Sequence, residues 1–148
     1  MKKKNNLKNK LVSIIVVNFF ISRFINQCIT SLKKQSYKEI EIIFVDNQSS
    51  DNSLKKIKSF RNIKIIRNKR KTIYGSYNQI DSYYRGFLRS NGKIIFFLDS
   101  DDYFKKNKIE KIVNQFENNQ SYKVLFDLPI YLHGTQKNYY QLKQFFFF

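Results

Sequence analysis

The sequence predicts an α/β domain in which helices cover both faces of a mostly parallel β-sheet. Short apolar runs alternate along the chain with segments whose apolar residues recur at helical spacing, which is the pattern of successive βαβ units. The 148 residues fit one compact domain. The composition, 42% hydrophobic and 17% aromatic, is too apolar for a disordered chain. One Cys and one His exclude an internal disulfide and a Cys/His zinc site, so any metal must be held by oxygen ligands.

The apolar runs are predicted to be the strands. They are continuous and rich in β-branched residues, as expected of strands covered on both faces. They are Leu11–Val17, Glu39–Val45, Ile63–Ile66 and Lys93–Leu98, with a fifth strand predicted at Tyr122–Phe126. None approaches the ~18 apolar residues of a membrane span. Lysines precede the first run, as in a signal peptide, but no small-residue cleavage site follows it. We therefore expect a cytoplasmic protein.

The segments between these runs are predicted to be amphipathic helices, because they carry apolar residues every three or four positions. The first helix is expected over Ile21–Gln35 and the fourth over Lys106–Asn118. The second is expected to begin at Asp51 or a neighbouring Ser, whose side chains can cap it. The third is expected to be capped by Ser76 and ended by Gly92. Its predicted inward face consists of Tyr77, Ile80, Tyr84, Phe87 and Leu88.

The formal net charge of +17 comes from 28 Lys and Arg against 11 Asp and Glu. Such a charge attracts polyanions, including nucleic acids, anionic lipids and the phosphates of small ligands. The basic residues are dispersed through residues 1–10, 55–71 and 105–111, and abundant Lys, Asn, Ile, Phe and Tyr together are also what an AT-rich coding sequence produces. We therefore expect no specific nucleic-acid partner, and peripheral contact with an anionic membrane surface stays open as an alternative.

Acidic residues gather where two of the predicted strands end. Of the 11 carboxylates, five follow the second and fourth runs: Asp46, Asp51, Asp99, Asp101 and Asp102. Ligands of open α/β sheets bind outside the carboxyl ends of the strands. In a chain this basic, the clustering indicates a binding site rather than a device for solubility.

Asp99 and Asp101 are the candidate metal ligands. Residues two apart on an extended segment project to the same side, so both carboxylates can face one point. Carboxylate oxygens suit Mg²⁺ or Mn²⁺, which use one or two of them together with phosphate oxygens, and such a metal stabilises a diphosphate leaving group. The alternative is a turn in which Ser100, Asp101 or Asp102 caps the next helix. The position directly after an apolar strand favours the metal site.

Three further residues are candidates for nucleotide binding. Asp46, at the end of the second run, can accept hydrogen bonds from a base or a ribose. Phe19 can stack on a base, or it can belong to the core. Arg85 can pair with a phosphate, or it can be a solvated charge on a helix. Cys28 lies on an apolar stripe and is expected in the core rather than as a nucleophile.

These motifs resemble those of the family 2 glycosyltransferases, which have the GT-A fold. The matching segments follow the family's order and spacing within about Val12 to Phe126, and they are Val12–Phe19, Glu41–Ser53 and Phe96–Asp102. The stretch Gly75–Gly86 is similar to the one that precedes the family's metal motif. The resemblance implies a Rossmann-like, mostly parallel sheet, of which this chain carries the N-terminal, nucleotide-binding part.

The resemblance also implies a reaction. It implies a sugar donor linked to UDP, GDP or dTDP, Mg²⁺ or Mn²⁺ at the Asp-x-Asp motif, and inverting transfer to a hydroxyl. The acceptor would be a glycan or a lipid-linked molecule at the inner face of the membrane, in cell-surface polysaccharide synthesis. By position, Phe19 flanks the base and Asp46 contacts the uracil or ribose region. Asp99 lies near the ribose and the metal, and Asp101 is the principal metal ligand. Ser100 is included among the residues that bind the nucleotide sugar.

The chain departs from the family pattern at several points. Val17 and Phe20 stand where many members have Pro and Asn, and Asn47 stands where a second Asp is common. The family's catalytic base lies beyond the metal motif, in an acceptor-binding half that we expect to be largely absent here.

We therefore expect a basic extension over residues 1–10, a nucleotide-sugar-binding domain over 11–127 and an irregular tail over 128–148. The tail ends in four Phe, which indicates either a truncated chain or an apolar segment folded back on the sheet. The alternative to an active enzyme is a catalytically inactive, nucleotide-binding remnant.

Overall fold

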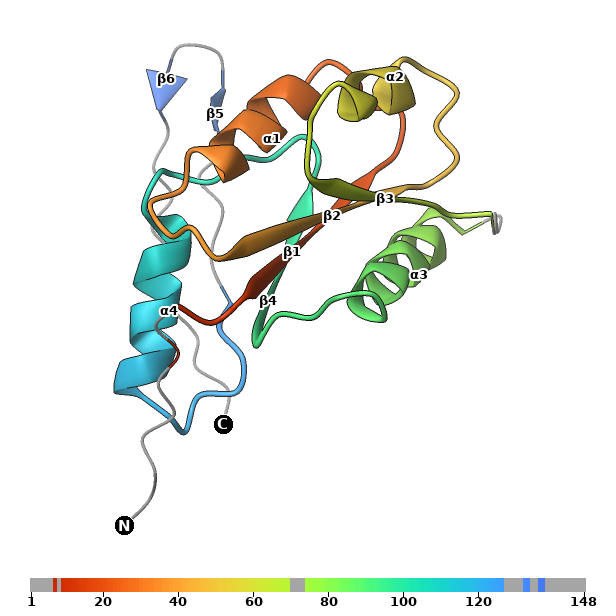
Figure 1. Ribbon diagram of the computed structural model, residues 1–148. Helices are drawn as coiled ribbons and strands as arrows, with labels where there is room; N and C mark the ends of the chain where they lie inside the picture. The colour runs from red at the N-terminus through yellow and green to blue at the C-terminus, as the bar shows by residue number, and fades with distance from the viewer. Residues whose placement is uncertain (1–6, 8, 70–73, 127–131, 134–135, 138–148) are drawn as a thin grey trace.

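The computed structural model describes residues 7, 9–69, 74–126, 132–133 and 136–137. Strands and helices alternate along the chain (Figure 1), and they are β1 (Val12–Asn18), α1 (Ile25–Lys33), β2 (Ile40–Asp46), α2 (Ser53–Lys58), β3 (Ile63–Arg67), α3 (Gly75–Phe87), β4 (Ile94–Asp99), α4 (Lys108–Asn118), β5 (Leu132–His133) and β6 (Gln136–Lys137). Within the described residues, no helix has the length and apolar character needed to cross a membrane.

The strands β1 to β4 form one parallel sheet with the order β3-β2-β1-β4, and β5 and β6 pair separately. β1 lies in the interior of the sheet and all of its residues are buried, which explains its nearly continuous apolar sequence. The register aligns Asn18 with Asp46 and Val17 with Asp99. The carboxyl ends of β1, β2 and β4 therefore meet at one edge. The predicted α/β class and parallel sheet are confirmed.

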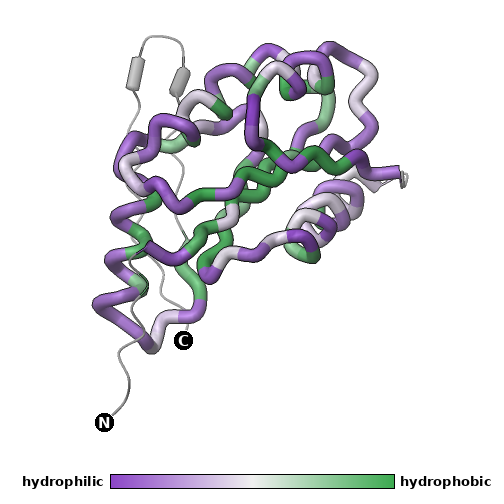
Figure 2. The backbone as a smooth tube through the Cα atoms, in the orientation of Figure 1, coloured by the Kyte–Doolittle hydropathy of each residue, from purple (hydrophilic) through white to green (hydrophobic). Residues whose placement is uncertain are grey.

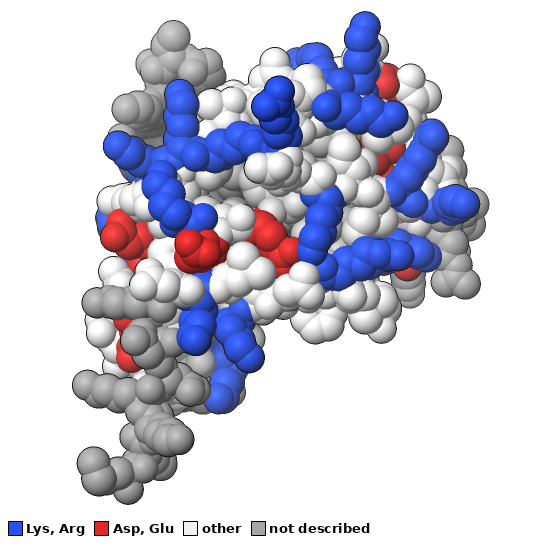
Figure 3. Space-filling model, viewed as in Figure 1, with Lys and Arg blue, Asp and Glu red and all other residues white. Residues whose placement is uncertain are grey.

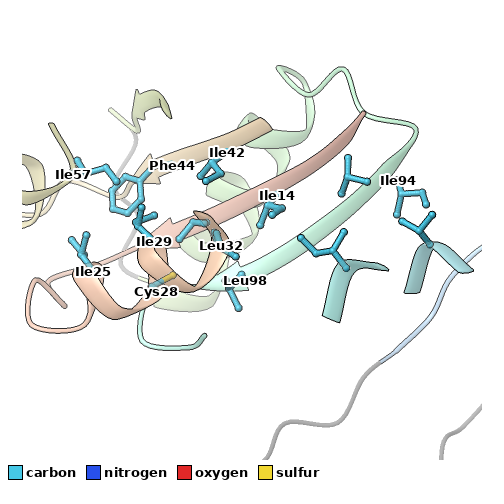
Figure 4. Packing of buried hydrophobic residues seen from close by; sticks show 14 residues of the cluster. Ile14, Ile25, Cys28, Ile29, Leu32, Ile42, Phe44, Ile57, Ile94 and Leu98 are labelled. Atoms are coloured by element: carbon cyan, nitrogen blue, oxygen red, sulfur yellow. The ribbon is translucent and has the colours of Figure 1, made fainter. Parts of the chain in front are cut away.

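Helices cover both faces of the sheet. The larger core lies between one face and the helices α1, α2 and α4, and Figure 4 shows Cys28 and Ile29 of α1 turned toward the strands. The opposite face carries a smaller cluster around Ile15 and Val45, against which Tyr83 of α3 packs. Figure 2 shows the most hydrophobic residues concentrated along the strands between these two layers.

The packing of α3 corrects the prediction for this helix. The residues that were expected to face inward are 47–66% exposed, and they are Tyr77, Ile80, Tyr84, Phe87 and Leu88. The helix instead buries small and polar residues at intervals of four, Asn78, Ser82 and Gly86. A Cβ atom on Gly86 would lie 2.3 Å from Cγ2 of Ile15. Glycine at this position is therefore what allows α3 to lie so close to β1.

Helix starts differ from the prediction in smaller ways. α1 begins at Ile25 rather than at Ile21, because residues 22–24 form a turn. α3 begins at Gly75, so Ser76 lies inside the helix and does not cap it. α2 begins at Ser53 with Asn52 as its N-cap residue, and no side chain caps it. The Ser53 N–H donates to the Asp51 carboxylate at 3.0 Å, two residues back and before the helix.

The predicted strand at Tyr122–Phe126 is wrong, because these residues are irregular. Val124 and Phe126 are 59% and 69% exposed, and no strand pairs with this segment in the described part of the chain. An apolar segment becomes a strand only when a neighbouring strand bonds its backbone. The predicted extension over residues 1–10 and tail over 128–148 lie mostly outside the described residues.

Glu41 joins three strands near the amino-terminal end of the sheet. Its carboxylate accepts hydrogen bonds from Ser13 Oγ of β1, from Lys64 Nζ of β3 and from the Asn91 N–H before β4, each at 2.6 Å. Burial opposes ionisation of this carboxyl, but the three hydrogen bonds outweigh burial and lower the pKa of Glu41 to about 2.

The fold is therefore expected to lose stability as the pH falls from about 4.5 toward 2. The pKa of Glu41 is lower in the folded than in the unfolded state, so its ionised form stabilises the fold above the unfolded pKa, and protonation removes that contribution. In urea unfolding at neutral pH, Glu41→Gln should lower the free energy of unfolding by about 1–2 kcal/mol. Solvent screening of the half-exposed Lys64 keeps the loss this small. The difference from wild type should vanish near the folded pKa. A difference that stays constant across the acid range would contradict this role of Glu41.

Candidate functional site

A cleft of about 320 Å³ opens at the carboxyl edge of the sheet, within the usual size range of small-molecule sites. Its walls come from the chain after β1, β2 and β4 and from the first turns of α3, and they include Phe19, Asn47, Gln79, Asp99, Ser100 and Asp101. The strands run parallel, so the residues that follow them emerge at the same edge. The cleft thus lies where the sequence predicts a ligand site.

The Asp-x-Asp motif occupies the end of β4. Asp99 and Asp101 both line the cleft, as predicted. Oδ1 of Asp99 accepts two hydrogen bonds from α3, from Gln79 Nε2 at 2.9 Å and from the Tyr83 hydroxyl at 2.7 Å. Asp101 is exposed, so its carboxylate is open to solvent at the mouth of the cleft.

Like charges meet at this end of β4. Burial, and then the carboxylates of Asp101 and Asp99, raise the pKa of Asp102. Burial, and then the Asp99 carboxylate, raise the pKa of Tyr83 well above its usual range, so the phenol stays protonated and donates to Asp99 at neutral pH. A cation in the cleft would relieve the repulsion among the three carboxylates.

These carboxylates fit a divalent cation that is shared with a ligand. No three Asp, Glu, His or Cys side chains in the described part of the chain could hold a metal ion on their own. Asp99 and Asp101 nevertheless line the same cleft, and Mg²⁺ is commonly bound by one or two carboxylates together with substrate phosphates. The donor set therefore suits a metal bound jointly with a diphosphate.

Asp46 lies beneath the cleft rather than in its wall. It is 0% exposed, and both of its oxygens accept hydrogen bonds from the protein, Oδ1 from Asn18 Nδ2 at 3.2 Å and Oδ2 from the Ser49 N–H at 3.1 Å. Asn18 also donates to Ser49 Oγ at 2.9 Å and accepts from Ser100 Oγ at 2.7 Å. These four residues form a buried polar network that joins the ends of β1, β2 and β4. In this arrangement Asp46 is not among the residues that line the cleft.

Of the other predicted residues, Phe19 and Ser100 border the cleft and Arg85 does not. Phe19 is 48% exposed, which leaves a face of its ring open for stacking. Its ring meets that of Phe20 edge to face, with the two ring centroids 4.5 Å apart. Ser100 is buried, with its hydroxyl committed to Asn18. The Arg85 guanidinium donates to Asp81 one turn earlier on α3 at 2.7 Å.

Three residues at this site, Asn47, Gln79 and Tyr83, are not among those that the sequence pattern predicts to bind a ligand. Asn47 is 6% exposed and lines the cleft, and its position directly after Asp46 was the available signal. Gln79 and Tyr83 are four residues apart and share one face of α3. The sequence pattern does not identify that face, because the aromatic stripe on the other side of α3 predicts a different buried face.

Comparison with known proteins gives a consistent result. The model of glycosyl transferase family 2 matches residues 13–147. An uncharacterized glycosyltransferase of Nostoc sp. is 31% identical over 127 residues, which are 85% of this chain and 38% of that protein. The Escherichia coli protein WfaP, named a UDP-Glc:α-D-GlcNAc-diphosphoundecaprenol β-1,3-glucosyltransferase, is 34% identical over 139 residues, 92% of this chain and 49% of its own.

Solved structures share the fold. Residues 1–349 of S. aureus TarS in complex with UDP align with a TM-score of 0.65 at 23% identity, over 74% of this chain and 33% of that one. The mannosyltransferase PcManGT of Pyrobaculum calidifontis, with GDP-Man and Mn²⁺, aligns with a TM-score of 0.55 at 14% identity, over 73% and 32% of the two chains. The chain spans less than half the length of each of these proteins.

Proposed function

The chain belongs to glycosyl transferase family 2, and from this we propose that its cleft binds the nucleoside diphosphate of a sugar donor together with Mg²⁺ or Mn²⁺. The observation that carries the proposal is the position of Asp99 and Asp101, two carboxylates in the wall of one cleft at the carboxyl ends of parallel strands. Relatives and structural neighbours supply the ligand class, since their names and titles include UDP-glucose, UDP and GDP-mannose.

Each residue of the cleft has a proposed part in donor binding. The exposed ring of Phe19 stacks on the base, and the amide of Asn47 offers both a donor and an acceptor to polar groups of the nucleoside. Asp101 is the principal metal ligand and Asp99 the second, next to the ribose. The bound metal would supply charge neutralisation of the diphosphate leaving group. Asp46 acts indirectly, by holding Asn18 and Ser49 beneath this site.

We further propose that the reaction is sugar transfer to an acceptor hydroxyl, with inversion, in the synthesis of a cell-surface glycan. The acceptors named for two relatives support this: a diphosphoundecaprenol-linked sugar for Escherichia coli WfgD, and poly(ribitol-phosphate) for Staphylococcus aureus TarP. Such a transfer needs a base that takes the proton of the acceptor hydroxyl, and we assign that role to no residue of the cleft. A nucleotide-binding chain without transferase activity is the competing proposal.

The positive charge of the chain assists the binding of the nucleotide donor and the approach of a lipid-linked acceptor. Lys and Arg side chains are distributed over much of the face shown in Figure 3, with few carboxylates between them. A positive surface raises the local concentration of anionic ligands, and of an anionic lipid surface that presents a lipid-linked acceptor. This contribution is expected to weaken with added salt.

Calorimetric titration of the full chain with UDP, GDP, dTDP and CMP, each with and without Mn²⁺, tests donor binding. Saturable binding of one diphosphate that requires Mn²⁺ is the expected result, with UDP the expected ligand. CMP, which lacks the second phosphate, serves as the control and should bind far more weakly. A folded sample that binds none of the four would exclude the proposed site. If binding is found, incubation with the matching nucleotide sugar and a lipid-linked acceptor would separate an active transferase from a binding remnant.

A further inference from the structure

Two side chains of α3 hold Asp99 at a single oxygen. The Tyr83 hydroxyl donates to Oδ1 at 2.7 Å and Gln79 Nε2 donates to the same atom at 2.9 Å. Both bonds go to a carboxylate, which makes them stronger than bonds between neutral groups. Among the described residues, no group donates to Oδ2 of Asp99. One oxygen of this cleft-lining carboxylate is thus fixed, and the other is left for a ligand.

Tyr83 is itself held in place. Its ring packs on the smaller core cluster of the sheet and meets the ring of Phe97 edge to face at 5.2 Å. α3 can bring Tyr83 this close to β4 because Gly86, one turn later, has no side chain to collide with Ile15. The hydroxyl is therefore presented to Asp99 by a packed ring and not by a mobile surface side chain.

We propose that Tyr83, assisted by Gln79, is a positioning residue that orients the Asp99 carboxylate for the metal–diphosphate ligand of the cleft. This inference rests on the proposed function, since it assumes that the Asp-x-Asp motif takes a divalent cation. A carboxylate without these donors rotates about two side-chain torsions, and that freedom is lost when it binds a ligand. With the donors in place, the carboxylate has already lost this rotational freedom when the protein folds, so the ligand binds more tightly. Groups that orient metal ligands in this way typically contribute about 10- to 100-fold to metal affinity.

Tyr83→Phe removes the hydroxyl and keeps the ring and its contact with Phe97. The full chain is titrated with Mn²⁺, alone and with UDP, and electron paramagnetic resonance measures the bound metal. The Kd for Mn²⁺ should be about tenfold higher in this variant than in wild type. Tyr84→Phe is the matched control, because Tyr84 is the next residue on α3 but is 57% exposed, and its Kd should equal that of wild type. Gln79→Leu alters an exposed residue, so it tests the second donor even if Tyr83→Phe fails to fold, and it should also raise the Kd, by up to about tenfold.

Two readouts separate positioning from a general structural effect. The line shape of protein-bound Mn²⁺ reports the symmetry of its ligands, so it should change in Tyr83→Phe and not in Tyr84→Phe. The urea midpoints of the variants show whether the fold has changed. If wild type binds Mn²⁺ and UDP but Tyr83→Phe and Gln79→Leu bind them equally well, the positioning role is wrong and the proposed function stands. If folded wild type binds neither, the proposed function fails and the positioning role fails with it.

Discussion

Asp101→Ala is expected to abolish Mn²⁺-dependent binding of the nucleoside diphosphate while the fold stays intact. The Asp101 carboxylate is exposed in the wall of the cleft, so its removal takes away the proposed principal metal ligand without opening a cavity in the core. The protein alone offers no three-ligand metal site among its described residues, and losing one of two carboxylates therefore leaves too few ligands. Calorimetry should show affinity lower by on the order of 100-fold or more, with an unchanged far-UV circular dichroism spectrum.

Glu39→Ala provides the control for Asp101→Ala. Glu39 is also an exposed carboxylate, but it precedes β2 at the opposite end of the sheet from the cleft. The two variants change the net charge equally, so they separate a specific ligand from the general electrostatic field. Equal affinities in Asp101→Ala and Glu39→Ala would place the diphosphate elsewhere and remove the Asp-x-Asp motif from the binding site.

Asp46→Ala is expected to destabilise the fold by about 3 kcal/mol. The carboxylate is completely buried and accepts hydrogen bonds from Asn18 and from the Ser49 N–H. Its removal leaves buried donors without an acceptor, at a cost of roughly 1–3 kcal/mol for each, and it opens a small cavity where the ends of β1 and β2 meet. Urea unfolding at neutral pH measures the loss, and Glu39→Ala should differ from wild type by less than about 0.5 kcal/mol.

The same variant decides between two roles for Asp46. The sequence resemblance assigns Asp46 to the uracil or ribose region, whereas the described geometry gives both of its oxygens to the protein. If Asp46→Ala keeps wild-type stability but loses nucleotide affinity, the carboxylate is a ligand after all and must turn toward the cleft on binding. A large loss of stability, with the affinity of the remaining folded protein reduced only modestly, supports the structural role.

The sequence alone determined the order of the elements from β1 to α4 and the edge of the sheet at which the cleft opens. β1 and β2 are identifiable because strands covered on both faces are continuously apolar. β4 lies at the edge of the sheet and keeps an apolar run although Phe97 is 54% exposed. Once the strands are known to alternate with helices, they run parallel, and the residues after Asn18, Asp46 and Asp99 must emerge together. The pairing of Asp99 with Asp101 in one cleft follows from that topology.

Only the tertiary structure decided which residues at this edge line the cleft and which are buried. Asp46 and Asp99 are each the last residue of a parallel strand. Asp46 is nevertheless enclosed by Asn18 and Ser49, whereas Asp99 borders the cleft. The difference arises from neighbouring strands and loops that are distant in sequence, so no local pattern reports it.

The sequence also did not predict which face of α3 is buried. A hydrophobic stripe ordinarily marks the buried face of a helix, but here small residues such as Gly86 make the contact with β1, because they allow a closer approach than the aromatic stripe would. That close approach turns Tyr83 toward Asp99. Periodicity records which residues share a face, and only packing against Ile15 settles which face is inside.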